Sequence, residues 1–73
     1  MEYFDQESAY EFEMISNDKL RCWHITGGSI DIKITIMQDK SLRAISQNGN
    51  ICEEGNPTLF KAINRAYKHW NLI

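Results

Sequence analysis

Four isoleucines alternate with polar residues near the middle of the chain, and this alternation constrains the fold more than any other feature. The apolar positions are Ile30, Ile32, Ile34 and Ile36, and the polar positions between them are Ser29, Asp31, Lys33 and Thr35. A strand turns successive side chains to opposite faces, and β-branched residues favour strands. The pattern therefore predicts a strand with one face toward a hydrophobic core and the other toward solvent.

Four other segments show shorter strand patterns between turn signals. The predicted strands are residues 10–15, 20–25, 42–46 and 50–53. Gly27–Gly28 and Asn48–Gly49 suit two-residue hairpin loops, and Asp5 is predicted to cap a short helical turn. Consecutive strands joined by short turns predict an antiparallel meander.

The hydrophobic period changes after Gly55. Asn56 suits the N-cap of a helix and Pro57 its first position. An apolar stripe follows at helical spacing: Leu59, Ala62, Ile63, Ala66, Tyr67 and Trp70. We expect a helix from Pro57 to about Trp70 that packs on the isoleucine face of the sheet. The predicted fold is one α+β domain over residues 1–73, an antiparallel meander of four to five strands with one C-terminal helix on one face.

Composition and cysteine content narrow the class of protein. Hydrophobic residues make up 42% of the 73 residues and aromatic residues 11%, which argues against disorder. No apolar run reaches the length of a membrane span, and the first residues lack the pattern of a signal peptide. We therefore expect a cytoplasmic protein, in the host cytoplasm if a phage encodes it. Cys22 and Cys52 are expected to be reduced and buried, with a disulfide between them as the less favoured alternative.

Catalytic and metal-binding patterns are weak. The residue types that bind zinc occur as Cys22, His24, Cys52 and His69, without the paired spacing of structural zinc sites. Cys22 and His24 share a predicted strand face about 7 Å apart, too far for a thiol and its base to touch. We expect no enzymatic activity, no metal and no cofactor.

Acidic residues gather in the first quarter of the chain, which has no lysine or arginine before Lys19. They are Glu2, Asp5, Glu7, Glu11, Glu13 and Asp18. Glu11 and Glu13 lie two residues apart on one predicted strand, about 7 Å along it, near the spacing of phosphates in a single nucleic-acid strand. We interpret the six residues as an acidic patch that binds the basic nucleic-acid-binding surface of a protein partner. A purely solubilising surface is the alternative.

Basic residues lie at the other end of the chain. Lys61, Arg65 and Lys68 share the polar side of the predicted helix. Three cations suit weak, salt-sensitive contact with phosphates, so nucleic-acid binding is the alternative function. A homodimer through an exposed edge strand is a third possibility.

The segment Asn56–Tyr67 resembles the closing helix of small accessory proteins of phages and mobile elements. Several of these proteins are compact β-meanders that end in one helix, and the likeness covers about the last quarter of this chain. Anti-CRISPR and anti-restriction inhibitors belong to this class, and many act stoichiometrically without catalytic residues. The resemblance implies an inhibitor of a nucleic-acid-handling bacterial defence complex, and it assigns no functional residue.

Overall fold

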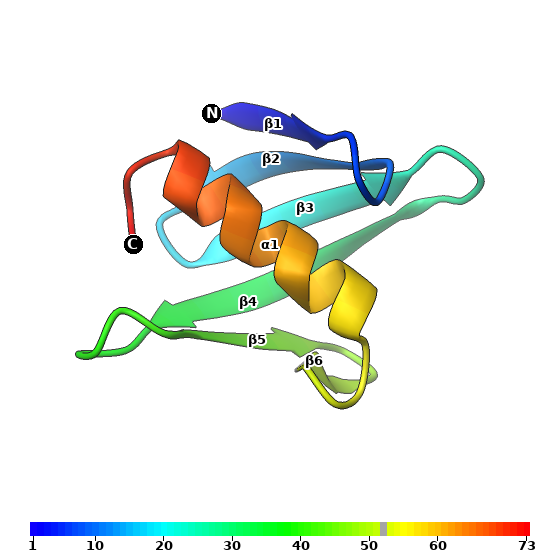
Figure 1. The fold of residues 1–73 in the computed structure, drawn as a ribbon. Helices are drawn as coiled ribbons and strands as arrows, with labels where there is room; N and C mark the ends of the chain where they lie inside the picture. Colours follow the sequence, from blue (N-terminus) through cyan, green and yellow to red (C-terminus); the bar gives the residue numbers. More distant parts are fainter. Residues whose placement is uncertain (52) are drawn as a thin grey trace.

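The computed structural model describes residues 1–51 and 53–73, which form one sheet and one helix (Figure 1). The elements are β1 (Glu2–Asp5), β2 (Tyr10–Ser16), β3 (Lys19–His24), β4 (Ser29–Ile36), β5 (Leu42–Ser46), β6 (Gly49–Ile51) and α1 (Pro57–His69). The strands lie in the order β1-β2-β3-β4-β5-β6, and every neighbouring pair is antiparallel. The predicted α+β meander with its helix on one face is confirmed.

The predicted count of four to five strands is wrong, because the described residues form six. The additional strand is β1, which pairs with β2 from Glu2↔Glu13 to Asp5↔Tyr10. Residues 6–9 form a turn between these strands. Asp5 does accept local hydrogen bonds there, from Ser8 N at 3.0 Å and, through its carbonyl oxygen, from Ala9 N at 2.8 Å. The prediction that Asp5 caps a turn thus identified a local contact. It missed β1, the strand whose last residue is Asp5.

Two predicted turns differ in detail from the structure. Ser46 and Gly49 are partners in the β5–β6 ladder, so Gln47 and Asn48 are the turn residues. Gly49 follows with a φ of +123°, which a residue with a Cβ rarely adopts. The β3–β4 connection spans residues 25–28 instead of two glycines. The predicted fifth strand corresponds to β6, and its residue Cys52 lies outside the described residues.

Helix α1 begins at the predicted residue, Pro57, and ends at His69, one residue before the predicted end. The Asn56 side chain accepts a hydrogen bond from Leu59 N at 3.3 Å, and Pro57 is the first helical residue. At the other end Asn71 has a φ of +61°, and Leu72 N donates to Tyr67 O at 2.9 Å, which is a Schellman-type ending. No helix among the described residues has the length and apolar character to span a membrane.

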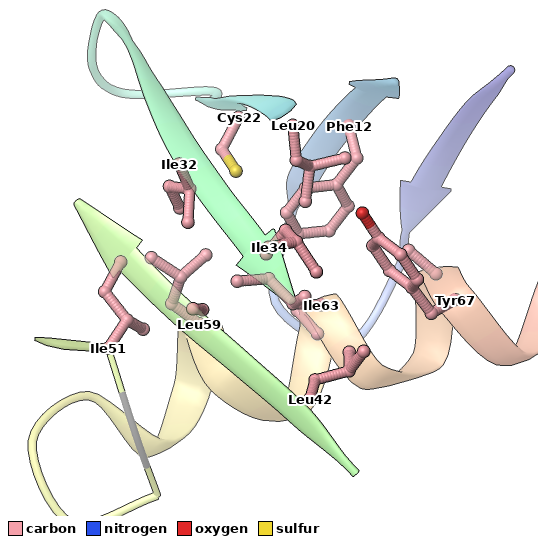
Figure 2. Packing of buried hydrophobic residues seen from close by; sticks show 13 residues of the cluster. Phe12, Leu20, Cys22, Ile32, Ile34, Leu42, Ile51, Leu59, Ile63 and Tyr67 are labelled. Atoms are coloured by element: carbon pink, nitrogen blue, oxygen red, sulfur yellow. The ribbon is translucent and has the colours of Figure 1, made fainter. Parts of the chain in front are cut away.

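The core lies between the sheet and α1 (Figure 2). Its buried residues are Phe12, Leu20, Cys22, Ile32, Ile34, Leu42, Ala44, Ile51, Leu59, Ala62, Ile63, Ala66 and Tyr67. Ile30 and Ile36, at the two ends of the isoleucine series, are each 39% exposed. An eight-residue strand is about 26 Å long and a 13-residue helix about 20 Å. Because α1 also crosses the sheet diagonally, it covers the middle of β4 and leaves both ends accessible.

The edges of the sheet are short. β1 and β6 are the outer strands, with four and three residues. Short edge strands present few unpaired backbone groups to another chain. The predicted edge-strand homodimer would have to use one of these two strands.

Candidate functional site

The sheet face opposite α1, here called the open face, carries most of the charged strand residues. Register and alternation place on it Glu2, Phe4, Glu11, Glu13, Lys19, Arg21, Trp23, Ser29, Asp31, Lys33, Thr35, Arg43, Ile45 and Asn50. Acidic residues occupy its β1–β2 side, whereas Lys19 and Lys33 are direct partners on β3 and β4. The open face is therefore acidic on one side and basic on the other.

The structure divides the six residues of the predicted acidic patch. Glu2, Glu11 and Glu13 lie together on the open face. Asp5 lies on the helix side and is 1% exposed. The other two acids occupy turns at either end of β2: Glu7 pairs with Arg65, and Asp18 accepts a hydrogen bond from Ser16 Oγ at 2.9 Å. Three residues of the predicted patch thus share a surface, and three do not.

The acidic side of the open face contains a like-charged pair. Glu2 and Glu13 are direct cross-strand partners, and such residues have Cβ atoms about 4.5–5.5 Å apart. Arg21 lies opposite Glu13 on β3, but its guanidinium donates to both carboxylate oxygens of Asp31, at 2.8 and 3.2 Å. Among the described residues, Glu2, Glu11 and Glu13 form no ion pair. Their charges are available to a cationic partner.

An aromatic row crosses the same side of the open face. Phe4, Glu11 and Trp23 are successive cross-strand partners on β1, β2 and β3, and they are called the aromatic row here. Phe4 is 49% exposed, and Trp23 is half-buried. A hollow of about 280 Å³ lies over this row, and its lining residues are Phe4, Ala9, Glu11, Trp23, His24 and Ile25.

The aromatic row was not predicted as a site from the sequence. One signal was present: Phe4 and Trp23 occupy the strand phase that faces away from the core. Large aromatic residues at polar positions indicate contact with something outside the fold, since interfaces are enriched in them. Aligning the two residues with Glu11 required the register of three strands.

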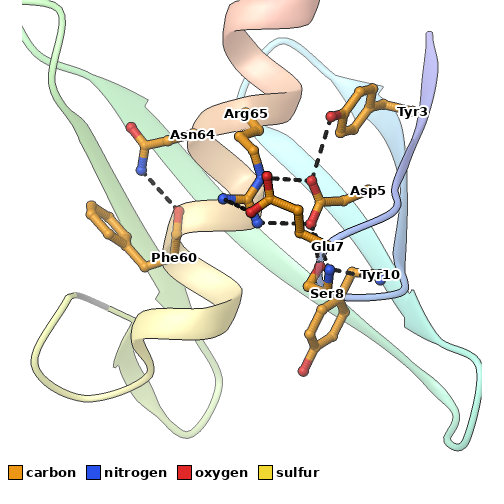
Figure 3. Close-up of polar contacts among 8 residues, drawn as sticks. All are labelled: Tyr3, Asp5, Glu7, Ser8, Tyr10, Phe60, Asn64 and Arg65. Atoms are coloured by element: carbon orange, nitrogen blue, oxygen red, sulfur yellow. Dashed lines mark hydrogen bonds and ion pairs between the residues drawn. The ribbon is translucent and has the colours of Figure 1, made fainter.

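The buried acid Asp5 joins β1 to α1 (Figure 3). Arg65 donates from Nε and Nη2 to the two carboxylate oxygens of Asp5, at 2.6 and 2.8 Å. Ser8 Oγ and Tyr3 Oη also donate to this carboxylate, and Arg65 Nη1 lies 3.3 Å from Glu7 Oε2. The hydrogen bonds from Arg65, followed by those from Ser8, lower the pKa of Asp5 to about 2 against opposing desolvation. Because Asp5 is bound by Arg65 from the helix and by Ser8 and Tyr3 from its own end of the chain, its role is structural.

The lowered pKa of Asp5 predicts a loss of stability in acid. The carboxylate is unpaired in the unfolded chain and titrates near its usual 3.8. Its contribution is therefore complete above about pH 4 and is lost as the pH falls toward 2, by roughly 2 kcal/mol in total. Thermal unfolding followed by circular dichroism from pH 6 to pH 2 measures this.

The Asp31→Asn variant is the control for this titration. The exposed ion pair between Asp31 and Arg21 contributes little to stability in the wild type. The variant should therefore still lose most of the stability that the wild type loses in acid. Asp5→Asn should be less stable at neutral pH and nearly independent of pH below 4. A wild-type Tm that stays constant from pH 4 to pH 2 would contradict the assignment.

The three basic residues of α1 are only partly available to a ligand. Lys61, Arg65 and Lys68 line a hollow of about 310 Å³ on the outer side of the helix, together with Glu53, Phe60 and Asn64. Arg65 is bound to Asp5 and Glu7, so its charge is largely balanced within the fold. Glu53 adds a negative charge at the rim. The hollow thus offers a phosphate two lysines that form no ion pair among the described residues, instead of three free cations.

The thiol and imidazole groups do not form a reactive site among the described residues. Cys22 is buried, as predicted, and desolvation raises the pKa of its thiol to about 12. His24 packs edge-on against Tyr10, and His69 packs against Tyr3. In the part of the chain that the structure describes, no three potential metal ligands lie together.

Comparison of the chain with family models, with curated proteins and with solved structures finds no match.

Proposed function

We propose that this chain is a non-enzymatic protein-binding module that contacts its partner through the acidic side of the open face. The observation that carries the proposal is the group of Glu2, Glu11 and Glu13, which form no ion pair among the described residues and lie around exposed Phe4. Like charges directly opposite on a sheet destabilise it. A cationic partner would convert this repulsion into attraction, and the aromatic row would supply apolar contact.

A basic nucleic-acid-binding surface is the partner chemistry that we favour. Glu11 and Glu13 repeat at about 7 Å along β2, so a groove built for successive phosphates can accept them. A protein that occupies such a groove inhibits stoichiometrically, as a mimic of nucleic acid. The resemblance of the closing helix to phage accessory proteins makes a bacterial defence complex in the host cytoplasm the proposed target.

Charge reversal on the open face tests this function. Immobilised wild-type protein is expected to capture its partner from bacterial lysate, and double-stranded DNA should release it by competing for the same surface. The Glu11→Lys/Glu13→Lys variant should keep the fold, because both side chains are at the surface, and bind at least about tenfold more weakly. Capture is quantified at two salt concentrations, since steering by charge weakens with ionic strength.

The matched control is the Glu53→Lys/Glu54→Lys variant. It makes the same change of charge in the exposed loop before α1, and Glu53 lies beside the helix. Equal capture by both variants and the wild type would show that the open face is not the contact surface. A second copy of the chain is the other possible occupant of the open face. It would be identified if the wild type self-associates and both double variants, Glu11→Lys/Glu13→Lys and Lys19→Glu/Lys33→Glu, abolish that association.

Nucleic-acid binding through α1 is the alternative, and the geometry gives it less support. The argument for it is the hollow lined by Phe60, Lys61 and Lys68, which offers an aromatic ring and two cations. The engagement of Arg65 by two carboxylates counts against it. Direct, salt-sensitive DNA binding that is lost in Lys61→Ala/Lys68→Ala would favour this alternative.

A further inference from the structure

We propose that the aromatic row is a receptor for one arginine side chain of the partner, whose guanidinium lies between Phe4 and Trp23 and pairs with Glu11. This inference rests on the proposed function and specifies the group that the open face recognises. It differs from a diffuse attraction between charged surfaces because it assigns the contact to three side chains.

The geometry of the row suits a flat cation. Neighbouring strands are about 4.8 Å apart, so Phe4 and Trp23, separated by β2, stand about 10 Å apart on either side of Glu11. A planar group stacked between two rings needs a contact of about 3.5–4 Å on each side. Small inward tilts of the two side chains therefore bring both rings against a guanidinium.

The chemistry of the row selects a guanidinium. The faces of tryptophan and phenylalanine attract cations, and arginine makes this contact more often than lysine. Glu11 supplies a carboxylate that can accept two parallel N–H bonds from the same group. A guanidinium is also weakly hydrated compared with an ammonium, so it loses less hydration free energy when it enters an aromatic hollow.

The hollow is large enough to take one side chain. Its volume of about 280 Å³ lies at the lower limit of small-molecule clefts, which run from roughly 300 to 1,000 Å³. Ile25, which is 75% exposed, extends its apolar wall. Ala9, in the β1–β2 turn, has a φ of +62° and also lines the hollow. Its single methyl group takes up little of the volume of the hollow.

Titration with small probes tests the receptor without knowledge of the partner. N-acetylarginine amide is added to ¹⁵N-labelled protein at low salt, and the indole N–H signals of Trp23 and Trp70 are followed by NMR. We expect a saturable shift of Trp23 with a millimolar dissociation constant. The shift of Trp70 should be smaller, because its indole N–H donates to the backbone carbonyl oxygen of Glu2 at 3.3 Å and does not line the hollow. N-acetylcitrulline amide, a neutral group of the same shape, should produce no saturable shift, and the lysine derivative a weaker one.

Two variants separate the receptor from general charge effects. Glu11→Gln should abolish the saturable shift. Glu13→Gln removes the same charge two residues, about 7 Å, along β2, and should weaken binding only about threefold. Trp23→Leu, with Trp70 as the spectroscopic reference for folding, should also abolish binding as judged by backbone amide shifts at Glu11. Equal binding of citrulline and arginine, equal or tighter binding of lysine, or equal loss in the two glutamine variants would overturn the proposal.

The outcomes also distinguish this proposal from the function on which it rests. If arginine binding fails while Glu11→Lys/Glu13→Lys still loses the partner, the open face binds through distributed charge and the receptor is wrong. If arginine binds as expected but the charge-reversed variant captures the partner normally, the receptor exists and the proposed function is wrong.

Discussion

Replacing Arg65 with alanine is expected to unfold most of the protein at room temperature. Asp5 is 1% exposed and accepts two hydrogen bonds from Arg65, at 2.6 and 2.8 Å. Without the guanidinium, a buried carboxylate would remain without its main counter-charge. Removing one partner of a buried ion pair typically costs about 3–5 kcal/mol. A domain of this size has a total stability of roughly 3–5 kcal/mol, so little would be left.

Urea unfolding at neutral pH, followed by circular dichroism, measures this loss. Lys61→Ala is the matched control, because Lys61 is an exposed cation on the same helix, and its unfolding free energy should change by less than about 0.5 kcal/mol. The double variant Asp5→Leu/Arg65→Met should recover part of the stability, because it leaves no charge buried. An Arg65→Ala variant as stable as Lys61→Ala would show that the pair does not hold β1 to α1.

The same ion pair explains why β1 was not predicted. In β1 the alternation places Asp5 toward the helix and Phe4 toward solvent, which is the reverse of an apolar-inside pattern. The reversal is stable because Arg65 neutralises the buried acid. That partner is 60 residues away in the sequence, and local patterns contain no information about it.

The parts of the fold that were predicted correctly depend on local patterns. The period-two isoleucines identified β4, and Asn56, Pro57 and the apolar stripe identified α1 to within one residue of its end. The exposure of Ile30 and Ile36 was not predictable in the same way. It depends on the length of α1 and its diagonal path over the sheet, which are tertiary properties.

The candidate site shows the same limit. Alternation alone places Glu11 and Glu13 on one face, and the structure has them there. The assumption that all six acids share a surface failed because nearness in sequence is not nearness on a sheet. Asp5 and Glu2 belong to one short strand yet face opposite sides of it.

Truncating two phenylalanines to alanine is expected to separate folding from binding. Phe12 is fully buried in the core (Figure 2), and Phe→Ala at such a position costs about 3–5 kcal/mol, comparable to the whole stability of the domain. Phe4, on the adjacent strand, is 49% exposed on the open face, so its truncation should cost about 1 kcal/mol or less. Circular dichroism with urea should thus find Phe12→Ala largely unfolded and Phe4→Ala folded.

The Phe4→Ala protein then allows a binding measurement in an intact fold. It lacks one of the two rings proposed to hold a guanidinium, so the arginine-induced shift of Trp23 should weaken severalfold, because one cation–π contact is worth about 0.5–1 kcal/mol at an exposed site. If Phe4→Ala unfolds as readily as Phe12→Ala, the aromatic row stabilises the sheet instead of serving a partner. If it folds and binds arginine like the wild type, Phe4 is not part of the receptor, and the exposure of this ring needs another cause. Because both variants make the same chemical change on neighbouring strands, any difference between them reports which face of the sheet each ring occupies.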